Sequence, residues 1–156
     1  LLAATPSIGL LSGRIHICGG FVLRAGMTIN NITFASGTTA LASATNQWAA
    51  LVRQSDRTIL RTGADQTTSA WAANNTKTFP LASAYTSPKD EVVVAAIMVA
   101  ATTVPNLSGI QNLTPTTTSA PTWGAISNTG QTSPLADGTV LAAFTTNVTV
   151  PWASLS

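Results

Sequence analysis

The sequence predicts an all-β protein, an antiparallel β-sandwich for which a jelly roll is one suitable arrangement. Roughly eight short segments rich in Val, Ile, Thr and aromatic residues are separated by Gly, Pro, Asn and Asp, which favour turns. One longer apolar run, residues 91–105, has the character of a buried central strand. Charged residues make up only 8% of the chain, against about 25% in an average protein, so Thr, Ser, Asn and Gln must supply the polar surface.

The central run is apolar from Val92 to Val104, with Glu91 before it and Pro105 after it. It is too short to span a membrane as a helix, which takes about 20 apolar residues. Its β-branched residues favour a strand over a buried helix. Because alternate strand residues point to opposite faces and neither face is polar here, both faces must be covered. A long loop of the same chain or a neighbouring subunit could cover the second face.

The segments before the central run alternate between apolar and polar residues. A turn or bulge is expected at Gly19-Gly20, and a β-bulge at Asn30-Asn31, where the alternation slips by one residue. Residues 35–46 form a loop of small residues, and one helical turn around Trp71 is an option within residues 65–75. The expected strands in this part cover residues 14–18, 21–24, 27–34, 47–53, 58–61 and 78–81.

The part after the central run is less regular. Residues 105–138 are rich in Thr, Pro and Ser and are expected to form a long loop, with a short strand at 123–126 as an option. Last strands are expected at 139–145 and 148–152, the final one at a sheet edge because it contains Pro151. The domain organisation is therefore an arm at residues 1–12 that leads into one β-sandwich domain, residues 13–156.

The charge and cysteine content exclude several classes of protein. The net charge is +2 and the basic residues are dispersed, so nucleic-acid binding is not expected. Cys18 is the only cysteine, so no intrachain disulfide can form. The chain starts without Met and shows no signal peptide, which favours a processed product or a domain of a longer protein.

No arrangement of residues predicts an enzyme. His16 is the only histidine, and it lies in an alternating strand, where an ordinary structural position is favoured over a base. The five acidic residues form no carboxylate pair or calcium loop, and one His with one Cys does not make a zinc site. No phosphate-binding loop is present. We therefore expect no catalytic residues, no metal and no cofactor.

A binding role is harder to exclude, since glycan sites combine a flat aromatic ring with nearby amides. Trp123 in its polar loop is one candidate for contact with a glycan or receptor, and Trp71 beside Asn74 and Asn75 is another. The alternative is that these tryptophans, like Trp48 and Trp152, pack in the core or at its rim. If a second subunit covers the central strand, Ala95, Ile97 and Val99 are the interface candidates.

The order of these elements resembles a domain of actinobacteriophage minor tail proteins. The similarity covers roughly residues 10–110 and is a pattern of core and turn residues. It includes G-x-T-I-x-x-I-x-F-x-S-G-T-T-A, T-x-x-A-W-A, K-T-F-P-L and a long apolar strand that ends in Val-Pro. The matching positions are Gly26 to Ala40, Gln47 to Arg57, Thr67 to Ala72, Lys77 to Leu81 and Tyr85 to Pro105. The chain departs from the family at Asp90 to Ala95, where members have a pair of tyrosines.

The resemblance implies a β-sandwich domain, often trimeric, at the tail tip or in tail fibres of a virion. Its expected role is assembly with other virion proteins and attachment to a host-surface receptor, such as an envelope glycan. It implies no enzyme and no membrane insertion. A capsid decoration or cement protein and a carbohydrate-binding module of a secreted enzyme are the alternatives.

Overall fold

The computed structural model describes residues 7–111, 124–146 and 149–156, and every regular element in them is a β-strand. This confirms the all-β prediction. The strands are β1 (Ser7–Gly9), β2 (Arg14–Leu23), β3 (Thr28–Ala35), β4 (Ala42–Arg53), β5 (Ile59–Thr62), β6 (Thr76–Thr86), β7 (Glu91–Thr103), β8 (Asn106–Gln111), β9 (Gly124–Ser127), β10 (Thr145–Thr146), β11 (Thr149–Pro151) and β12 (Ala153–Leu155).

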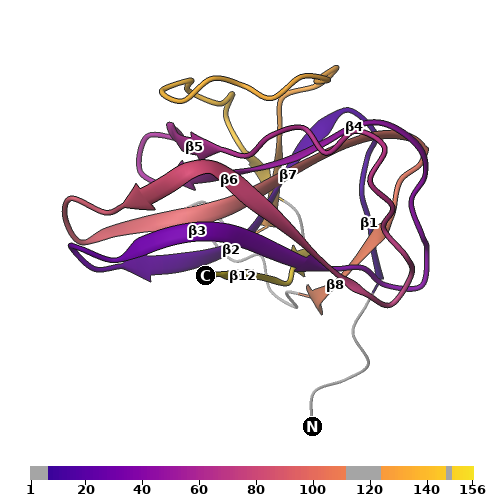
Figure 1. The fold of residues 1–156 in the computed structure, drawn as a ribbon, viewed down its shortest axis with the longest axis horizontal. Coiled ribbons are helices and arrows are strands. Elements are labelled where there is room, and N and C mark those ends of the chain that lie inside the picture. The colour runs from indigo at the N-terminus through magenta and orange to yellow at the C-terminus, as the bar shows by residue number, and fades with distance from the viewer. Residues whose placement is uncertain (1–6, 112–123, 147–148) are drawn as a thin grey trace, which may run out of the picture.

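The strands form a sandwich of two main antiparallel sheets, with a small third sheet at one end (Figure 1). The larger sheet has the order β10-β9-β2-β7-β4-β5, and the facing sheet has the order β12-β3-β6. The third sheet, β1-β8-β11, joins the end of β3 through a bridge between Ser36 and Leu107.

The predicted central run is β7, and it lies between β2 and β4 along almost its whole length. Side chains from one of its faces fill the space between the two main sheets. Phe34, Phe79, Trp71, Ile97 and other buried residues form this inner core. The rings of Phe34 and Trp71 each meet the Phe79 ring edge to face, with centroids 5.8 Å apart in both pairs.

The other face of β7 is covered by residues 128–144, called here the covering segment. Met98 and Ala96 of this face pack with Trp48 of β4 and with Leu141 of the covering segment, in a second core on the outer side of the larger sheet. The covering segment is the gold loop at the top of Figure 1, on the opposite side of the molecule from β12. Of the two ways to cover the central strand, a loop of the same chain is thus the one observed.

Hydrogen bonds to the larger sheet fix the covering segment. The Trp48 indole N–H donates to the Thr132 carbonyl (2.9 Å), and the Thr62 hydroxyl donates to the Leu135 carbonyl (2.7 Å). Asp137 accepts from the Thr62 N–H (2.9 Å) and pairs with Arg61 (2.6 Å). A segment without regular secondary structure can lie on an apolar sheet face because its polar groups are paired in this way.

The expected bulges are confirmed, since β2 shifts register between Cys18 and Gly20, and β3 shifts between Ile29 and Asn31. Other boundaries differ from those expected. β4 begins at Ala42 inside the expected loop, β6 runs on to Thr86, and residues 65–75 contain no helical turn. The expected long loop at 105–138 is interrupted by β8 and β9. Residues 139–144 form no strand, because they belong to the covering segment.

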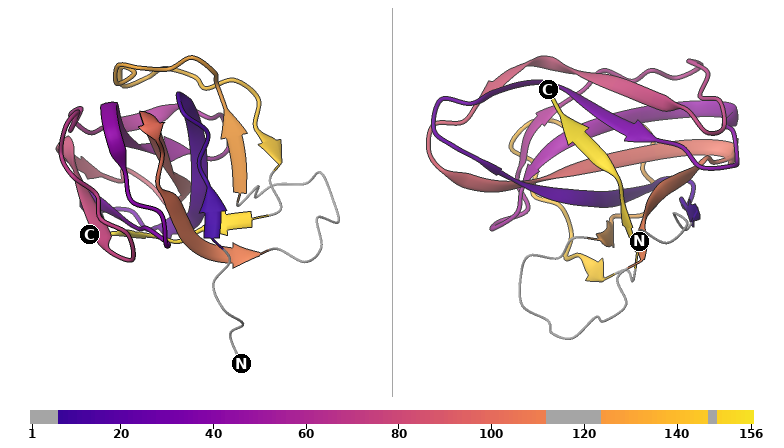
Figure 2. Two further views of the ribbon diagram at one scale, coloured as in Figure 1. Left: turned by 90° about the vertical axis from the view of Figure 1, so that its right-hand side faces the viewer. Right: turned by 90° about the horizontal axis from the view of Figure 1, so that it is seen from below.

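The C-terminal strands run along the outer edge of two sheets. β11 pairs with β8, and β12 pairs with β3, so residues 149–155 pass from the small sheet to the main one. Figure 2 (right) shows β12 in yellow on the face seen from below. Pro151 lies in β11, an edge strand, which confirms the position predicted for it.

The inner position of β7 predicts that Ile97→Ala destabilises the fold without changing assembly. Ile97 is fully buried, so the change should lower the free energy of unfolding by about 2–5 kcal/mol in a urea titration. The matched control is Val140→Ala, at an exposed position, with an expected change within about 0.5 kcal/mol. A variant of unchanged stability but altered solution mass would contradict this assignment.

Candidate functional site

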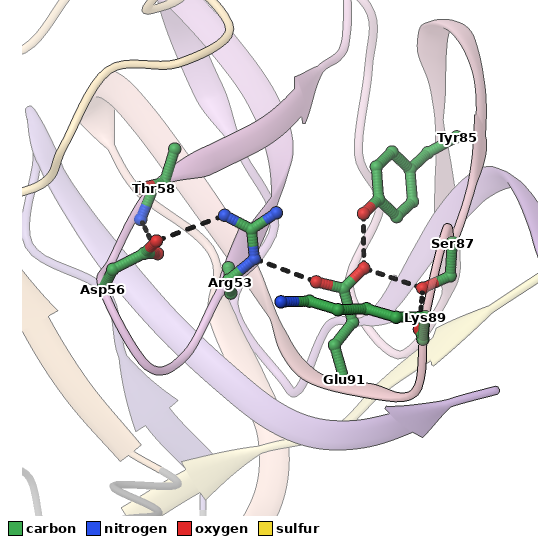
Figure 3. Close-up of polar contacts among 7 residues, drawn as sticks. All are labelled: Arg53, Asp56, Thr58, Tyr85, Ser87, Lys89 and Glu91. Atoms are coloured by element: carbon green, nitrogen blue, oxygen red, sulfur yellow. Dashed lines mark hydrogen bonds and ion pairs between the residues drawn. The ribbon is translucent and has the colours of Figure 1, made fainter. Parts of the chain in front are cut away.

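A buried polar network surrounds Glu91, at the end of the sandwich that holds the β4–β5 and β6–β7 turns (Figure 3). One carboxylate oxygen of Glu91 accepts hydrogen bonds from the Tyr85 and Ser87 hydroxyls, and the other accepts from Arg53 Nε at 2.9 Å. Arg53 also pairs with Asp56, which accepts from the Thr58 N–H. The network therefore ties the two turns together.

The Glu91 carboxylate is poorly suited to act as a base. Burial alone would raise its pKa, but the hydrogen bonds from Tyr85, Ser87 and Arg53 outweigh burial and hold the pKa below its usual range. Burial, followed by the Glu91 contact, raises the pKa of Tyr85. A hollow of about 300 Å³ lies beside Arg53, Lys89 and Glu91, but the carboxylate in it is already satisfied. We assign the network a structural role.

Lys77 is a second buried charge, and it points inward from β6. Its ammonium group donates to Gln47 Oε1 (2.8 Å) and to the Ser69 carbonyl (2.8 Å), and it lies 5.5 Å from the centre of the Phe79 ring. Burial lowers the pKa of Lys77 to about 8, so the group stays protonated at neutral pH. These contacts fix the loop that precedes β6.

His16 and Cys18 lie in β2 and are both buried. His16 Nε2 accepts from the Leu11 N–H at 2.9 Å, and burial lowers the His16 pKa to about 4. Burial also raises the pKa of the Cys18 thiol. Neither side chain is placed for acid–base or nucleophilic chemistry.

Among residues 7–111, 124–146 and 149–156, no group of three or more His, Cys, Asp or Glu side chains is placed to hold a metal ion. No helix in these residues is long and apolar enough to cross a membrane.

The opposite end of the sandwich has a different character, because Asn74 and Asn75 form a tight turn there. The Asn75 carbonyl accepts from the Ser36 N–H (2.8 Å), the Ser36 hydroxyl (2.9 Å) and the Trp71 indole N–H (3.3 Å). The Asn74 N–H donates to the Gly37 carbonyl at 2.6 Å. Asn74 has a φ of 53°, in the left-handed region that Asn tolerates better than most residues. The backbone of this turn is thus held in place by the core.

These residues border a shallow hollow of about 350 Å³, called here the asparagine hollow. It is lined by Ala35, Ser36, Asn74, Asn75, Thr76 and Ser108. None of these side chains is charged, and three of them, Asn74, Asn75 and Thr76, are exposed. The arrangement offers amide and hydroxyl groups on a fixed backbone, which suits binding of a neutral polar ligand better than a reaction.

The structure brings three predicted site residues together, with different roles. Asn74 and Asn75 line the asparagine hollow, as a contact role requires. Trp71 is only 2% exposed and lies in the inner core, so it positions Asn75 and cannot itself stack on a ligand. Trp123 lies outside the residues that the structure describes.

The predicted interface residues need correction. Ala95, Ile97 and Val99 are at most 1% exposed and pack in the inner core against the facing sheet. No part of them lies on a surface that a second subunit could contact.

Sequence reasoning missed Trp152, whose exposure is 45%. The sequence grouped it with the tryptophans of the core or its rim. Trp152 follows the edge-strand residue Pro151, and that position is the one signal that could have indicated exposure.

No protein-family model, curated protein sequence or solved structure matches the chain. The functional argument therefore depends on the site geometry and on the pattern of residues described above.

The Glu91 network predicts that acid destabilises the protein and that Glu91→Gln reduces this effect. The pKa of folded Glu91 lies below its ordinary value of 4.5. The contribution of the charged carboxylate to folding stability is therefore complete above pH 4.5, and it is lost as pH falls through the folded pKa. At neutral pH, Glu91→Gln should cost about 1–3 kcal/mol of unfolding free energy. Urea titrations between pH 3 and pH 7 measure both effects.

The matched control for this experiment is Asp90→Asn. Asp90 pairs with Arg24 at 3.8 Å between highly exposed side chains, so its change should cost less than about 1 kcal/mol. If Glu91→Gln left the acid dependence as it is in the unmodified chain, another carboxyl would be responsible.

Proposed function

We propose that the chain is a non-catalytic domain of a bacteriophage virion, at the tail tip or in a tail fibre, that serves assembly and attachment to the host surface. The observation that carries attachment is the asparagine hollow, an open, uncharged site whose backbone is fixed by Ser36 and Trp71. The virion context comes from the resemblance to minor tail proteins. Fixed polar groups on a rigid sandwich give affinity because little order must be gained on binding.

The described titratable groups support a binding role over catalysis. Glu91, Lys77 and His16 are buried, and each forms hydrogen bonds within the chain. A catalytic acid or base must reach a substrate with a proton site free to react. The exposed groups of the asparagine hollow are amides and hydroxyls, which bind but do not transfer protons readily at neutral pH.

The same hollow also fits a second candidate, a carbohydrate-binding module of a secreted enzyme. Location distinguishes the two, since a tail domain is part of the particle and a module is not. A capsid decoration protein would be in the particle as well, but on its head.

Antibodies against residues 1–156 should label the tail tip or tail fibres of particles of the phage whose genome encodes the chain. Immunogold electron microscopy measures the label, and particles treated with pre-immune serum provide the control. Label on the capsid would favour the decoration protein, and a chain absent from purified particles would contradict the virion proposal.

We also propose that the domain works as a trimer, which the resemblance favours. Both faces of β7 are covered within the chain, so the central strand provides no separate argument for a partner. Light scattering on residues 1–156 should give three times the 15.9 kDa of one chain. A mass of one chain at high micromolar concentration would contradict trimer formation by this domain alone.

A further inference from the structure

An exposed tryptophan lies next to the asparagine hollow. Trp152 lies between β11 and β12. Its backbone N–H donates to the carbonyl of Ser108, a residue of the hollow, at 2.8 Å. Its side chain is 45% exposed, whereas Trp48 and Trp71 are at most 2% exposed. An aromatic ring beside a few fixed polar groups is the combination that ligand sites use, so its exposure there is informative.

The strand register places Trp152 next to a residue of the hollow. β12 pairs with β3 only from Ala153 onward, which lies opposite Phe34. Trp152 continues the pairing of β11 with β8, since Pro151 pairs with Gly109 and the Trp152 backbone N–H donates to the Ser108 carbonyl. The Ser108 hydroxyl in turn donates to the Ser36 carbonyl, and both serines line the hollow. Ser108 therefore joins Trp152 to the hollow.

The hollow offers polar groups from Asn74, Asn75 and Thr76, beside the small Ala35 side chain. Three side-chain groups of the hollow form no hydrogen bond with any other described residue. They are the side-chain amide of Asn74, the Nδ2 group of Asn75 and the hydroxyl of Thr76. Donors and acceptors are thus available in the hollow, and an exposed aromatic side chain lies next to its residue Ser108.

We propose that Trp152 and the asparagine hollow form a binding site for a neutral saccharide. A sugar ring presents an apolar C–H face, which packs on an indole, and hydroxyls that pair with amide and hydroxyl groups. The hollow contains no charged side chain to match an acidic or basic ligand. Its volume of about 350 Å³ is at the low end for ligand sites, which suits one sugar unit of a longer chain.

This inference names the ligand class of the proposed attachment site, and in that respect it rests on the proposed function. The preference of the hollow for a neutral ligand follows from where the charged residues lie. Several of the few charged residues, including Arg24, Arg53, Lys89 and Asp90, lie at the opposite end of the sandwich, and the nearby Lys77 is buried and bonded to Gln47. Screening at physiological salt acts within about 8 Å, so these charges contribute little at the hollow.

The test is a titration of isotope-labelled residues 1–156 with neutral probes, the methyl glycosides and trisaccharides of glucose, galactose, mannose and arabinose. At least one probe should shift the NMR signals of Ser36, Asn74, Asn75, Thr76 and the Trp152 indole, and should quench tryptophan fluorescence. Trp152→Ala should weaken this binding at least tenfold, and Trp152→Phe should retain part of it. Asn74→Gly, which keeps the positive φ and removes the amide, should weaken it as well.

The control is Met27→Ala, which removes a side chain of the same 45% exposure at the other end of the sandwich and should leave binding unchanged. Three results would overturn the inference: no shift with any neutral probe at millimolar concentration, shifts confined to other residues, or a preference for glucuronic acid glycosides over the neutral probes. Wild-type titration decides these even if Trp152→Ala fails to fold.

The two proposals can fail separately. Saccharide binding at the hollow together with antibody label on the capsid would support this inference and contradict the tail proposal. Label at the tail tip without any saccharide shift would contradict this inference alone.

Discussion

The structure depends on one strand that has no polar face. Because β7 is apolar on both sides, the larger sheet must bury both of its surfaces, and it acquires two cores. The sheet β12-β3-β6 provides one cover, and the covering segment provides the other. A loop is an unusual cover, since its backbone groups need partners away from water. The side chains of Thr62 and Trp48 and the backbone of Ile59 supply several of them.

The scarcity of charge gives the two ends of the sandwich different properties. At one end, Arg53 and Glu91 join two turns through a network in which both Glu91 oxygens accept hydrogen bonds. At the other end, neutral amides and hydroxyls lie on a backbone held by Ser36 and by the buried Trp71. Stability and the proposed recognition are thus assigned to separate regions. Changes at the asparagine hollow can alter binding with little effect on the network around Glu91.

The sequence predicted those features that depend on alternation of neighbouring residues. The central strand follows from its apolar, β-branched run, the bulge at Gly19-Gly20 from the glycine pair and the bulge at Asn30-Asn31 from a slip in alternation, and all three are observed. The covering segment could not be predicted, because its few apolar residues, such as Leu141 and Phe144, follow no period. Local polarity alone does not reveal tertiary contacts of this kind.

The two tryptophans show the same limit at the candidate site. Trp71 has polar neighbours in sequence but is buried, because its indole N–H finds the Asn75 carbonyl within the fold. Trp152 lies in a segment that changes partner from β8 to β3, so no single strand pattern predicts which way it faces. Asn74 and Asn75 were found because they are amides close in sequence to an aromatic residue, Trp71.

The short strand β12 also protects the molecule from its own copies. It covers the edge of β3, and the Ser156 carbonyl accepts the N–H groups of Asn30 and Asn31 at the bulge. Thr28–Ala35 contains no charged residue that would repel another strand. If proteolysis removed residues 153–156, this edge would become a template for strand addition. A clipped chain would then be prone to aggregate edge to edge, and it would also lose the contacts of Ala153 and Leu155 with the inner core.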